Sequence, residues 1–454
     1  MMKYFHFRGI YTGSEWMTPA HVGVDEHGLI QYISEKAPAA PTPLEFVEGY
    51  ALAGFQNAHS HAFQYAMAGR AEIHPVGSND DFWSWREAMY ACALSMDPDE
   101  IQAVATMLYI EMLRKGYTHV AEFHYLHHDK DGKAYANLSE MGLRLLEAAK
   151  TAGIRITLIP VFYQKGGFGK DPQPRQRRFI SKTVDDYFHL LDDSAEAVKN
   201  YAFANLGFSV HSLRAVDEKD ILRTFNEGPK TIPFHIHTAE QLKEVEDCVH
   251  HLKQRPVEWM LNSLPVDERF HLVHCTHMND DEVNRLAKSG GNAVLCPGTE
   301  GNLGDGIFRL TDFAKAGGNW SIGTDSHISL NYLEDLRWLD YAQRFTTHKR
   351  NTFDNGARML IDKTTSSGRK AMGLNPKSFL QLDSPLDVVV FDGKSPLLSH
   401  GKNDFMLSSI LYNCDSADII GTMVNGRWVV KHHHHEHLKE TRTSFERVLK
   451  SINF

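Results

Sequence analysis

The chain has 454 residues, a formal net charge of −9 and the composition of an ordinary globular protein. This acidic balance gives no general reason to bind nucleic acid or an anionic membrane surface. No apolar run reaches the roughly 18 residues of a membrane-spanning helix, and the amino terminus lacks an apolar segment of the signal-peptide type. The five cysteines have no paired spacing, which favours a reducing compartment. We expect a cytoplasmic protein without disulfides.

Both chain ends predict short β-strands, expected at 5–11, 21–24, 29–33, 387–393, 417–424 and 428–430. Asn425-Gly426, between the last two of them, is a strong hairpin signal. We therefore expect one small β-sandwich domain built from residues 1–53 and 379–454. After the histidine run at 432–435, apolar residues at near-helical spacing predict a surface turn and a terminal helix.

Residues 54–378 alternate helical patterns with short apolar runs. Helices are expected at 98–115, 138–152, 218–226, 240–250 and 280–288. Strands are expected at 118–123, 154–162, 203–210, 232–236, 270–273, 293–295 and 321–323. About eight strands alternating with helices are typical of a parallel α/β barrel or a doubly wound sheet.

Histidines and one aspartate stand where these strands should end. They are His59, His61, His124, His211, His237, His274 and Asp325. In a (β/α)8 barrel the carboxyl ends of all strands form one mouth, where catalytic residues collect. A doubly wound sheet would place its chemistry at a switch point, and no glycine-rich phosphate loop is evident. We therefore predict an α/β fold whose core is a TIM-type (β/α)8 catalytic barrel.

Two histidine pairs indicate a metal site. His59 and His61 are two residues apart at a strand end, so both imidazoles can point to the same side. His235 and His237 repeat the pattern on another strand, where either one can face the metal, and Glu240 follows as an acid. A lone pair of this kind is more often structural, but two pairs at separate strand ends favour a site. A catalytic zinc typically takes three protein ligands and keeps an open position for water.

Other polar motifs receive a structural interpretation. His127-His128-Asp129 is expected to form a polar loop rather than a second metal site. Trp83 and Trp85 are expected to pack rather than to stack on a substrate. The sequence leaves open whether residues 164–182, with their Gly-Gly and Pro-Arg content, close over a substrate.

The strand-end motifs resemble those of the amidohydrolase superfamily. His-Ser-His at 59–61, His-Thr-Ala-Glu at 237–240, Leu-Val-His at 272–274 and Gly-Thr-Asp-Ser-His at 323–327 are similar to the metal and acid/base motifs of its mononuclear, deaminase-like members. Within the superfamily, residues 50–345 resemble the formimidoylglutamate deiminase family. The stretches that carry this resemblance are HSHAFQYAMAG, DFWSWREAMY, AEFHYLHHD, HSLRAV, RPVEWML, EGNLGDGIF and EDLRWLDYAQR. The chain ends fit more loosely.

The resemblance implies a hydrolase that deiminates N-formimino-L-glutamate to N-formyl-L-glutamate and ammonia, a reaction of histidine degradation. It implies one zinc ion and an acid/base set. The metal ligands would be His59, His61, His237 and Asp325, and the acid/base groups Glu240, His274 and Asp325. Where binuclear members carry a lysine, this chain has Phe208-Ser209-Val210-His211, which supports a single metal. Iron or manganese could occupy the same ligands.

A dicarboxylate substrate needs cationic partners. Arg86 and Arg214 are expected to bind the carboxylates, because guanidinium groups bind carboxylates bidentately. Tyr125 and His211 could donate hydrogen bonds, and Gln64 lies close in sequence to the first histidine pair. Apart from this substrate, the expected partner is a second copy of the chain in a homodimer.

Two alternatives remain open. A deaminase of an aminated heterocycle such as guanine would keep the zinc chemistry, but Arg86 and Arg214 disfavour it because two cations suit a dicarboxylate. A non-enzymatic barrel scaffold would be expected to lose ligands, and this chain retains them. The chain departs from the family pattern at Gly298 and Gly301, in an expected loop at 296–303, and at Val210, where a proline is usual. These departures could alter loop geometry and substrate fit.

Overall fold

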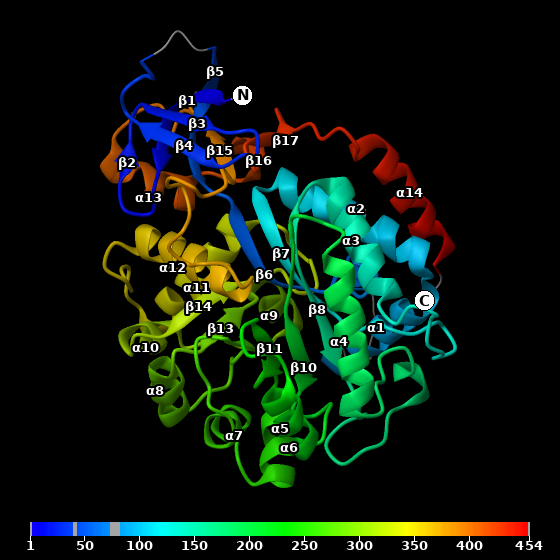
Figure 1. Cartoon of the computed structure of the whole chain (residues 1–454). Coiled ribbons are helices and arrows are strands. Elements are labelled where there is room, and N and C mark those ends of the chain that lie inside the picture. Colours follow the sequence, from blue (N-terminus) through cyan, green and yellow to red (C-terminus); the bar gives the residue numbers. More distant parts are fainter. Residues whose placement is uncertain (1, 40–42, 73–81, 453–454) are drawn as a thin grey trace.

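Two sheets organise the computed structural model, which describes residues 2–39, 43–72 and 82–452 (Figure 1). A nine-stranded parallel sheet from the middle of the chain curls into a barrel, and an eight-stranded mixed sheet is built from both chain ends. The predicted fold class is therefore confirmed. No helix in the described ranges is long and apolar enough to cross a membrane. All five cysteines are free and buried, as their spacing predicted.

The barrel strands pair in parallel, in the order in which they occur along the chain. They are β6 (Phe55–Ser60), β7 (Tyr117–His124), β8 (Arg155–Phe162), β10 (Phe208–Ser212), β11 (Phe234–Thr238), β12 (Phe270–His274), β13 (Asn292–Leu295) and β14 (Asn319–Ile322), with the short β9 (Ala204–Leu206) beside β8. A parallel bridge between Ser60 and Asp325 joins the last segment to the first. Because the strands are all parallel, their carboxyl ends meet at one mouth.

Helices surround the barrel, most of them on its outside (Figure 1). They are α1 (Phe82–Ser95), α2 (Pro98–Arg114), α3 (Glu140–Ala152), α4 (Val184–Val198), α5 (Glu218–Glu227), α6 (Leu242–Leu252), α7 (Pro256–Ser263), α8 (Asp280–Ser289), α9 (Pro297–Leu303), α10 (Leu310–Lys315), α11 (Tyr332–Thr347) and α12 (Gly356–Ala371). Short 3-10 turns occupy Ala62–Met67, Pro174–Gln176 and Ser416–Asp418. With helices outside and side chains inside, the barrel strands are buried on both faces, which explains their continuous apolar runs.

Local signals account for helix ends such as those of α2. Asp97 accepts a hydrogen bond from Glu100 N, and Glu100 caps Asp97 N in return, while Pro98 takes the first helical position. The chain leaves the helix through Gly116, whose φ of 91° is disfavoured for residues with a side chain. The helix expected at 98–115 therefore ends where its glycine predicted.

The chain ends form the mixed sheet in the order β17-β16-β15-β5-β1-β3-β4, with β2 beside β1. Its strands are β1 (Lys3–Tyr11), β2 (Trp16–Met17), β3 (Ala20–Val24), β4 (Ile30–Ser34), β5 (Leu44–Ala53), β15 (Val388–Asp392), β16 (Ile419–Val424) and β17 (Arg427–Lys431). Phe5, Phe7, Val22 and Val388 lie in its separate apolar core. The domain boundaries at residues 53 and 378 stay a prediction.

Two further helices follow in the carboxyl-terminal part, α13 (Asn403–Asn413) and α14 (Leu438–Ser451). The terminal helix α14, drawn in red, lies beside α2 (Figure 1). The ring of Phe445 stacks on Tyr65 with centroids 5.3 Å apart. The terminal helix expected after the histidine run is thus present, and it packs against the barrel.

Two expected elements differ from the structure. The strand expected at 203–210 is split into β9 and β10, with Gly207 between them. The loop expected at 296–303 is largely the short helix α9. Pro297 takes its first position, and the side chain of Glu300 accepts a hydrogen bond from Cys296 N at 2.8 Å. These two start signals outweigh the weak helix propensity of Gly298 and Gly301.

Barrel closure predicts a stability effect at Gly323. A Cβ there would lie 2.7 Å from His59 N and 2.8 Å from His59 O. We expect Gly323→Ala to lower the free energy of unfolding by about 1–3 kcal/mol, measured by denaturant titration, because the two segments must move apart. Gly301→Ala is the control, since no atom lies within 4 Å of its Cβ. Equal unfolding free energies for the two variants would contradict the expectation.

Candidate active site

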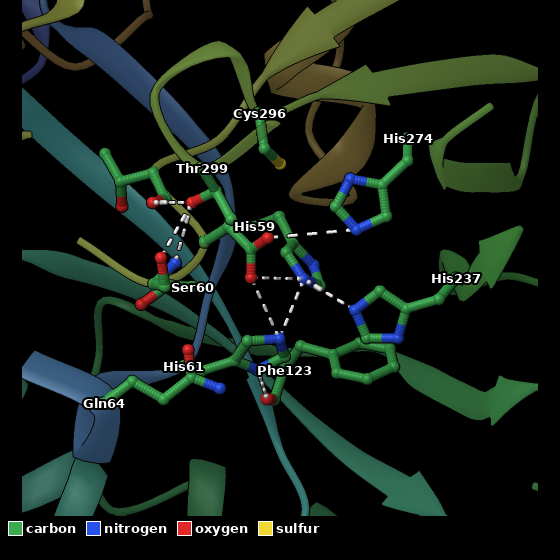
Figure 2. Close-up of polar contacts among 12 residues, drawn as sticks. His59, Ser60, His61, Gln64, Phe123, His237, His274, Cys296 and Thr299 are labelled. Atoms are coloured by element: carbon green, nitrogen blue, oxygen red, sulfur yellow. Dashed lines mark hydrogen bonds and ion pairs between the residues drawn. The ribbon is translucent and has the colours of Figure 1, made fainter. Parts of the chain in front are cut away.

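Four side chains converge at the mouth of the barrel: His59, His61, His237 and Asp325. Figure 2 shows the three histidine rings pointing toward one another. His59 Nε2 lies 3.1 Å from His61 Nε2 and 3.1 Å from His237 Nε2. Asp325 Oδ1 lies 3.2 Å from His61 Nε2 and 3.6 Å from His59 Nε2. All four side chains are buried. The residues predicted as metal ligands therefore lie together, contributed by β6, β11 and the segment after β14.

Hydrogen bonds on the far side of two rings test whether this cluster fits a metal ion. His61 Nδ1 donates to the carbonyl of Phe123 at 2.7 Å, and His237 Nδ1 donates to the carbonyl of His211 at 3.0 Å. A neutral imidazole protonated at Nδ1 carries its lone pair on Nε2. The Nε2 lone pairs of His61 and His237 therefore both point into the cluster, and His59 Nε2 could donate a proton to only one of the two. A cation at the centre would be bound by both of these lone pairs.

The spacing of the ligand atoms also fits a metal ion. Tetrahedral bonds of about 2.0–2.1 Å, as zinc forms to histidine, place neighbouring nitrogens about 3.3 Å apart. The observed separations of 3.1 Å are close to this value. The residues present thus fit one ion with three imidazole ligands and one carboxylate.

The charge states are those that metal binding requires. Burial, followed by the neighbouring histidines, holds the pKa of His59 and of His237 well below the ordinary value, so both imidazoles are neutral. Burial would raise the pKa of Asp325, but its contact with His61 and the nearby His59 hold that pKa below its usual range. The cluster therefore offers neutral imidazoles at His59 and His237 and an ionised carboxylate at Asp325.

The backbone is strained at this mouth. Positive φ angles occur at Ala239 (54°), His274 (73°), Cys275 (54°), Asp325 (49°) and His327 (64°). Such conformations cost of order 1–3 kcal/mol each and persist only where the surrounding structure forces them. Several of them within one barrel mouth indicate that the geometry of this site is imposed by the fold.

A buried polar network holds the two segments that supply most of the ligands. Ser60 Oγ, at the end of β6, donates to Glu122 Oε2 of β7 at 2.6 Å. Asn57 Nδ2 donates to Thr324 Oγ1 at 2.7 Å, and Thr324 N donates back to Asn57 Oδ1 at 3.0 Å. These bonds tie β6 to the segment that carries Asp325. The sequence analysis did not single out Asn57, Glu122 or Thr324. Asn57 lies two residues before the predicted ligand His59, and Thr324 directly precedes the predicted ligand Asp325.

The predicted acid/base groups Glu240 and His274 face each other beside the cluster. His274 Nε2 lies 3.6 Å from Glu240 Oε1 and 3.8 Å from Asp325 Oδ2. Burial would lower the pKa of His274, but the carboxylates of Glu240, Glu300 and Asp325 raise it to about 10. Three groups able to hold or transfer protons thus border the same small space.

A cavity opens next to the cluster of His59, His61, His237 and Asp325. All five residues predicted to bind substrate line it, namely Gln64, Arg86, Tyr125, His211 and Arg214. Gln64 Nε2 donates to Tyr125 Oη at 2.8 Å, and Arg86 Nη2 lies 3.5 Å from Tyr163 Oη. Trp85, expected only to pack, also lines the cavity, whereas the side chain of Trp83 lies outside the described residues.

Arg214 is held between two carboxylates. Its Nη1 lies 3.2 Å from Glu244 Oε2, and its Nη2 lies 3.4 Å from Glu240 Oε2. Burial would lower the pKa of Arg214, but Glu244 and Glu240 raise it above its ordinary value. Sequence reasoning missed Glu244, which follows Glu240 by one helical turn and also accepts a hydrogen bond from Glu240 N at 3.0 Å. Arg214 is therefore placed to orient Glu240 as well as to meet a ligand.

Two histidines near predicted strand ends, His124 and His235, do not point into the cluster of His59, His61, His237 and Asp325. His124 was expected at the mouth, but its ring packs against His127 with centroids 5.1 Å apart, and it faces away from the metal cluster. Successive side chains of a strand alternate in direction, and Phe123 takes the inward position of β7. On β11, His235 Nε2 donates to the carbonyl of Ala371 at 3.0 Å, so His237 is the inward member of that pair.

The expected polar loop after β7 agrees with the contacts there. His127 Nε2 donates to the carbonyl of Val161, and His128 Nε2 donates to the carbonyl of Ile180, each at 2.9 Å. Neither histidine belongs to a group of potential metal ligands in the part of the chain that the structure describes.

Comparison with known proteins establishes the family. The amidohydrolase family model matches residues 50–429. The chain belongs to the amidohydrolase family. It is 42% identical to formimidoylglutamate deiminase from Pseudomonas aeruginosa over 440 residues, covering 96% of each chain. It is 26% identical to 5-methylthioadenosine/S-adenosylhomocysteine deaminase from Haloquadratum walsbyi, over 83% of this chain and 78% of that one. An amidohydrolase structure from Brucella melitensis superimposes with a TM-score of 0.93 and 40% identity, covering 99% of each chain.

These similarities identify the chain as a hydrolase that acts on carbon–nitrogen bonds. Its resemblance to deiminases, noted from the motifs alone, is confirmed by the full-length identity.

The opposite orientations of the two histidines on β11 predict different effects on metal binding. We expect His237→Asn to lose most of the bound metal, because its Nε2 points into the cluster. His235→Asn is the matched control and should retain about one ion per chain, since its ring bonds the Ala371 carbonyl instead. Metal content by inductively coupled plasma mass spectrometry measures both. Equal losses in the two variants would contradict the assignment.

Proposed function

We propose that this enzyme hydrolyses the formimino group of N-formimino-L-glutamate, giving N-formyl-L-glutamate and ammonia as a step of histidine degradation. One zinc ion would be held by His59, His61, His237 and Asp325. The observation that carries the proposal is that two guanidinium groups line the cavity that also reaches the metal cluster. The 42% identity with a formimidoylglutamate deiminase supports the same substrate.

The cavity offers complementary groups for a substrate with two carboxylates. The half-buried Arg86 and the more deeply buried Arg214 supply positive charge in the cavity wall, where they can form charge-assisted hydrogen bonds to carboxylates. Arg214 already contacts Glu240 and Glu244, so a substrate carboxylate would share its guanidinium with them. Tyr125, Gln64 and His211 add uncharged hydrogen-bonding groups on the same wall.

The reaction consumes one water and releases ammonia. When bound, zinc lowers the pKa of a coordinated water toward neutrality and so supplies the nucleophile. Asp325 Oδ2 takes up the proton that the attacking water loses. Glu240 Oε1 delivers a proton to the imino nitrogen as the oxygen adds to the formimino carbon, which gives an amino group. The proton held by Asp325 then passes to this amino group, and the carbon–nitrogen bond breaks to release ammonia. The hydroxyl proton of the tetrahedral species returns to Glu240 as the formyl C=O forms. His274 Nε2, between these two carboxylates, orients the attacking oxygen and stabilises the developing tetrahedral species.

The alternative functions have weaker support. A heterocycle deaminase is the function of the 26% identical relative, but two guanidinium groups in the cavity suit a dianion better than a neutral base. A scaffold without activity would not need four converging buried ligands beside two acid/base groups. The expected homodimer stays a prediction.

A substrate panel tests the proposed function. We expect zinc-loaded enzyme to release ammonia rapidly from N-formimino-L-glutamate, slowly from N-formimino-L-aspartate and not from guanine. Arg86→Gln should raise the KM for the glutamate compound, because the variant loses a charged partner of a carboxylate. Arg223→Gln, at an exposed ion pair with Asp185, is the control. Turnover of guanine alone would overturn the substrate assignment.

The proton delivery predicts the effect of a single substitution at Glu240. Glu240→Gln cannot carry a proton, so we expect kcat to fall by about 10²–10⁴-fold while the bound zinc is retained. Glu246→Gln alters an exposed glutamate on α6, the helix that begins just after Glu240, and should change neither property. Ammonia release and metal content measure both effects. Near-normal turnover of Glu240→Gln would refute the role.

A further inference from the structure

A buried carboxylate stands behind His274, on the side away from the metal cluster. Glu300 Oε1 lies 3.3 Å from His274 Nδ1. Glu300 is only 4% exposed and comes from α9, a helix that follows β13. Glu300 begins the stretch EGNLGDGIF that carries part of the family resemblance, but the sequence analysis gave it no role, because it lies in a stretch expected to be a loop.

The Glu300 carboxylate is itself fixed. The same Oε1 atom accepts a hydrogen bond from Cys296 N at 2.8 Å, which anchors it at the start of α9. Cys296 and His274 lie next to each other at the mouth (Figure 2). The acceptor for His274 therefore does not depend on a mobile side chain.

This contact determines which edge of the His274 ring faces the cavity. Because a carboxylate only accepts, Nδ1 carries the proton of the hydrogen bond to Glu300. The opposite nitrogen, Nε2, is buried and has no hydrogen-bond partner in the described part of the chain. It points at Glu240 Oε1 and Asp325 Oδ2, at 3.6 and 3.8 Å. The atom left free is the one that borders the reaction space.

A second contact holds the ring face. The His274 ring stacks on His237 with centroids 5.5 Å apart and planes inclined by 15°. Stacking limits tilt but leaves the ring free to turn within its plane or to flip. A flip about the Cβ–Cγ bond would put the Cδ2 and Cε1 carbons where Nδ1 and Nε2 now lie, and a directional bond at Nδ1 opposes this flip. Glu300 supplies that bond.

We propose that Glu300 is a positioning residue for the hydrolysis: it holds Nδ1–H of His274 and thereby directs Nε2 toward Glu240 and Asp325. The inference rests on the proposed function, in which His274 acts at the reacting centre. Carboxylate–histidine pairs of this kind orient imidazoles in many metal and acid/base sites. Glu300 touches neither the cavity nor the metal ligands in this arrangement, so it acts through His274.

Glu300 also caps α9, so a purely structural role must be separated from the positioning role. Glu282 provides a matched control. It is a buried glutamate that accepts a hydrogen bond from Asn279 N at 2.8 Å, at the start of α8, and it pairs with Arg255 at 2.8 Å. It performs the same capping task away from the cavity.

The first experiment compares Glu300→Ala, Glu300→Gln and Glu282→Ala by ammonia release, zinc content and thermal unfolding. We expect Glu300→Ala to lower kcat by about 10–100-fold with KM and bound zinc nearly unchanged. Glu300→Gln should lose less, because its amide oxygen can still accept from Nδ1–H, and it keeps the test valid if the alanine variant does not fold. Glu282→Ala should lower stability but not kcat. A kcat loss in Glu300→Ala no greater than that in Glu282→Ala would overturn the inference.

A double-mutant cycle with His274→Asn then tests the route. If Glu300 acts through His274, Glu300→Ala should change kcat little in the His274→Asn background. A full multiplicative loss there would overturn the inference. Normal turnover of His274→Asn itself would refute the proposed role of His274, and the inference with it. Low turnover of His274→Asn with normal turnover of Glu300→Ala would refute the positioning role alone.

Discussion

The site depends on the backbone contact that closes the barrel between Ser60 and Asp325. His61 N donates to Asp325 O at 3.2 Å, and Asp325 N donates to His59 O at 3.0 Å. The first and last barrel segments are more than 260 residues apart in the chain, and this one bridge brings three of the four proposed metal ligands around one point. Gly323 permits the close approach, because a side chain there would collide with His59.

Charged groups around the cavity come in partnered sets. Arg214 contacts Glu240 and Glu244, and His274 lies between Glu240, Glu300 and Asp325. A buried charge without a partner is costly, and removing one member of such a set leaves the other uncompensated. The carboxylates that take no direct part in chemistry therefore keep the reactive side chains in one arrangement. Much of the site is preorganised in this way before substrate binds.

The local sequence predicted most of the fold and placed several histidines and one aspartate at the barrel mouth, while the family resemblance supplied the full set of predicted ligands. Continuous apolar runs between helical patterns indicated the barrel strands, and His59, His61 and Asp325 stood at strand ends where the mouth forms. The buried residues that the sequence analysis did not identify share one feature. Glu244 and Glu300 sit in helical or glycine-rich stretches, where an acidic residue usually faces solvent, and no local pattern marks them as buried. The helix α9 was missed because its start depends on the Glu300 side chain as well as on Pro297.

The sequence by itself determined which residues stand at strand ends and which pairs share a side, because strand geometry repeats every two residues. Only the tertiary structure decided which side faces the cavity. On β7 Phe123 occupies the inward position, so His124 packs outward. On β11 the ring of His235 bonds to the Ala371 carbonyl of α12, so His237 is the histidine that points into the cluster. The same holds for Arg214, whose two carboxylate partners come from the segment that follows β11. The physical reason is that the direction of a strand's face is set by what packs against it, and that packing comes from elements distant in the chain.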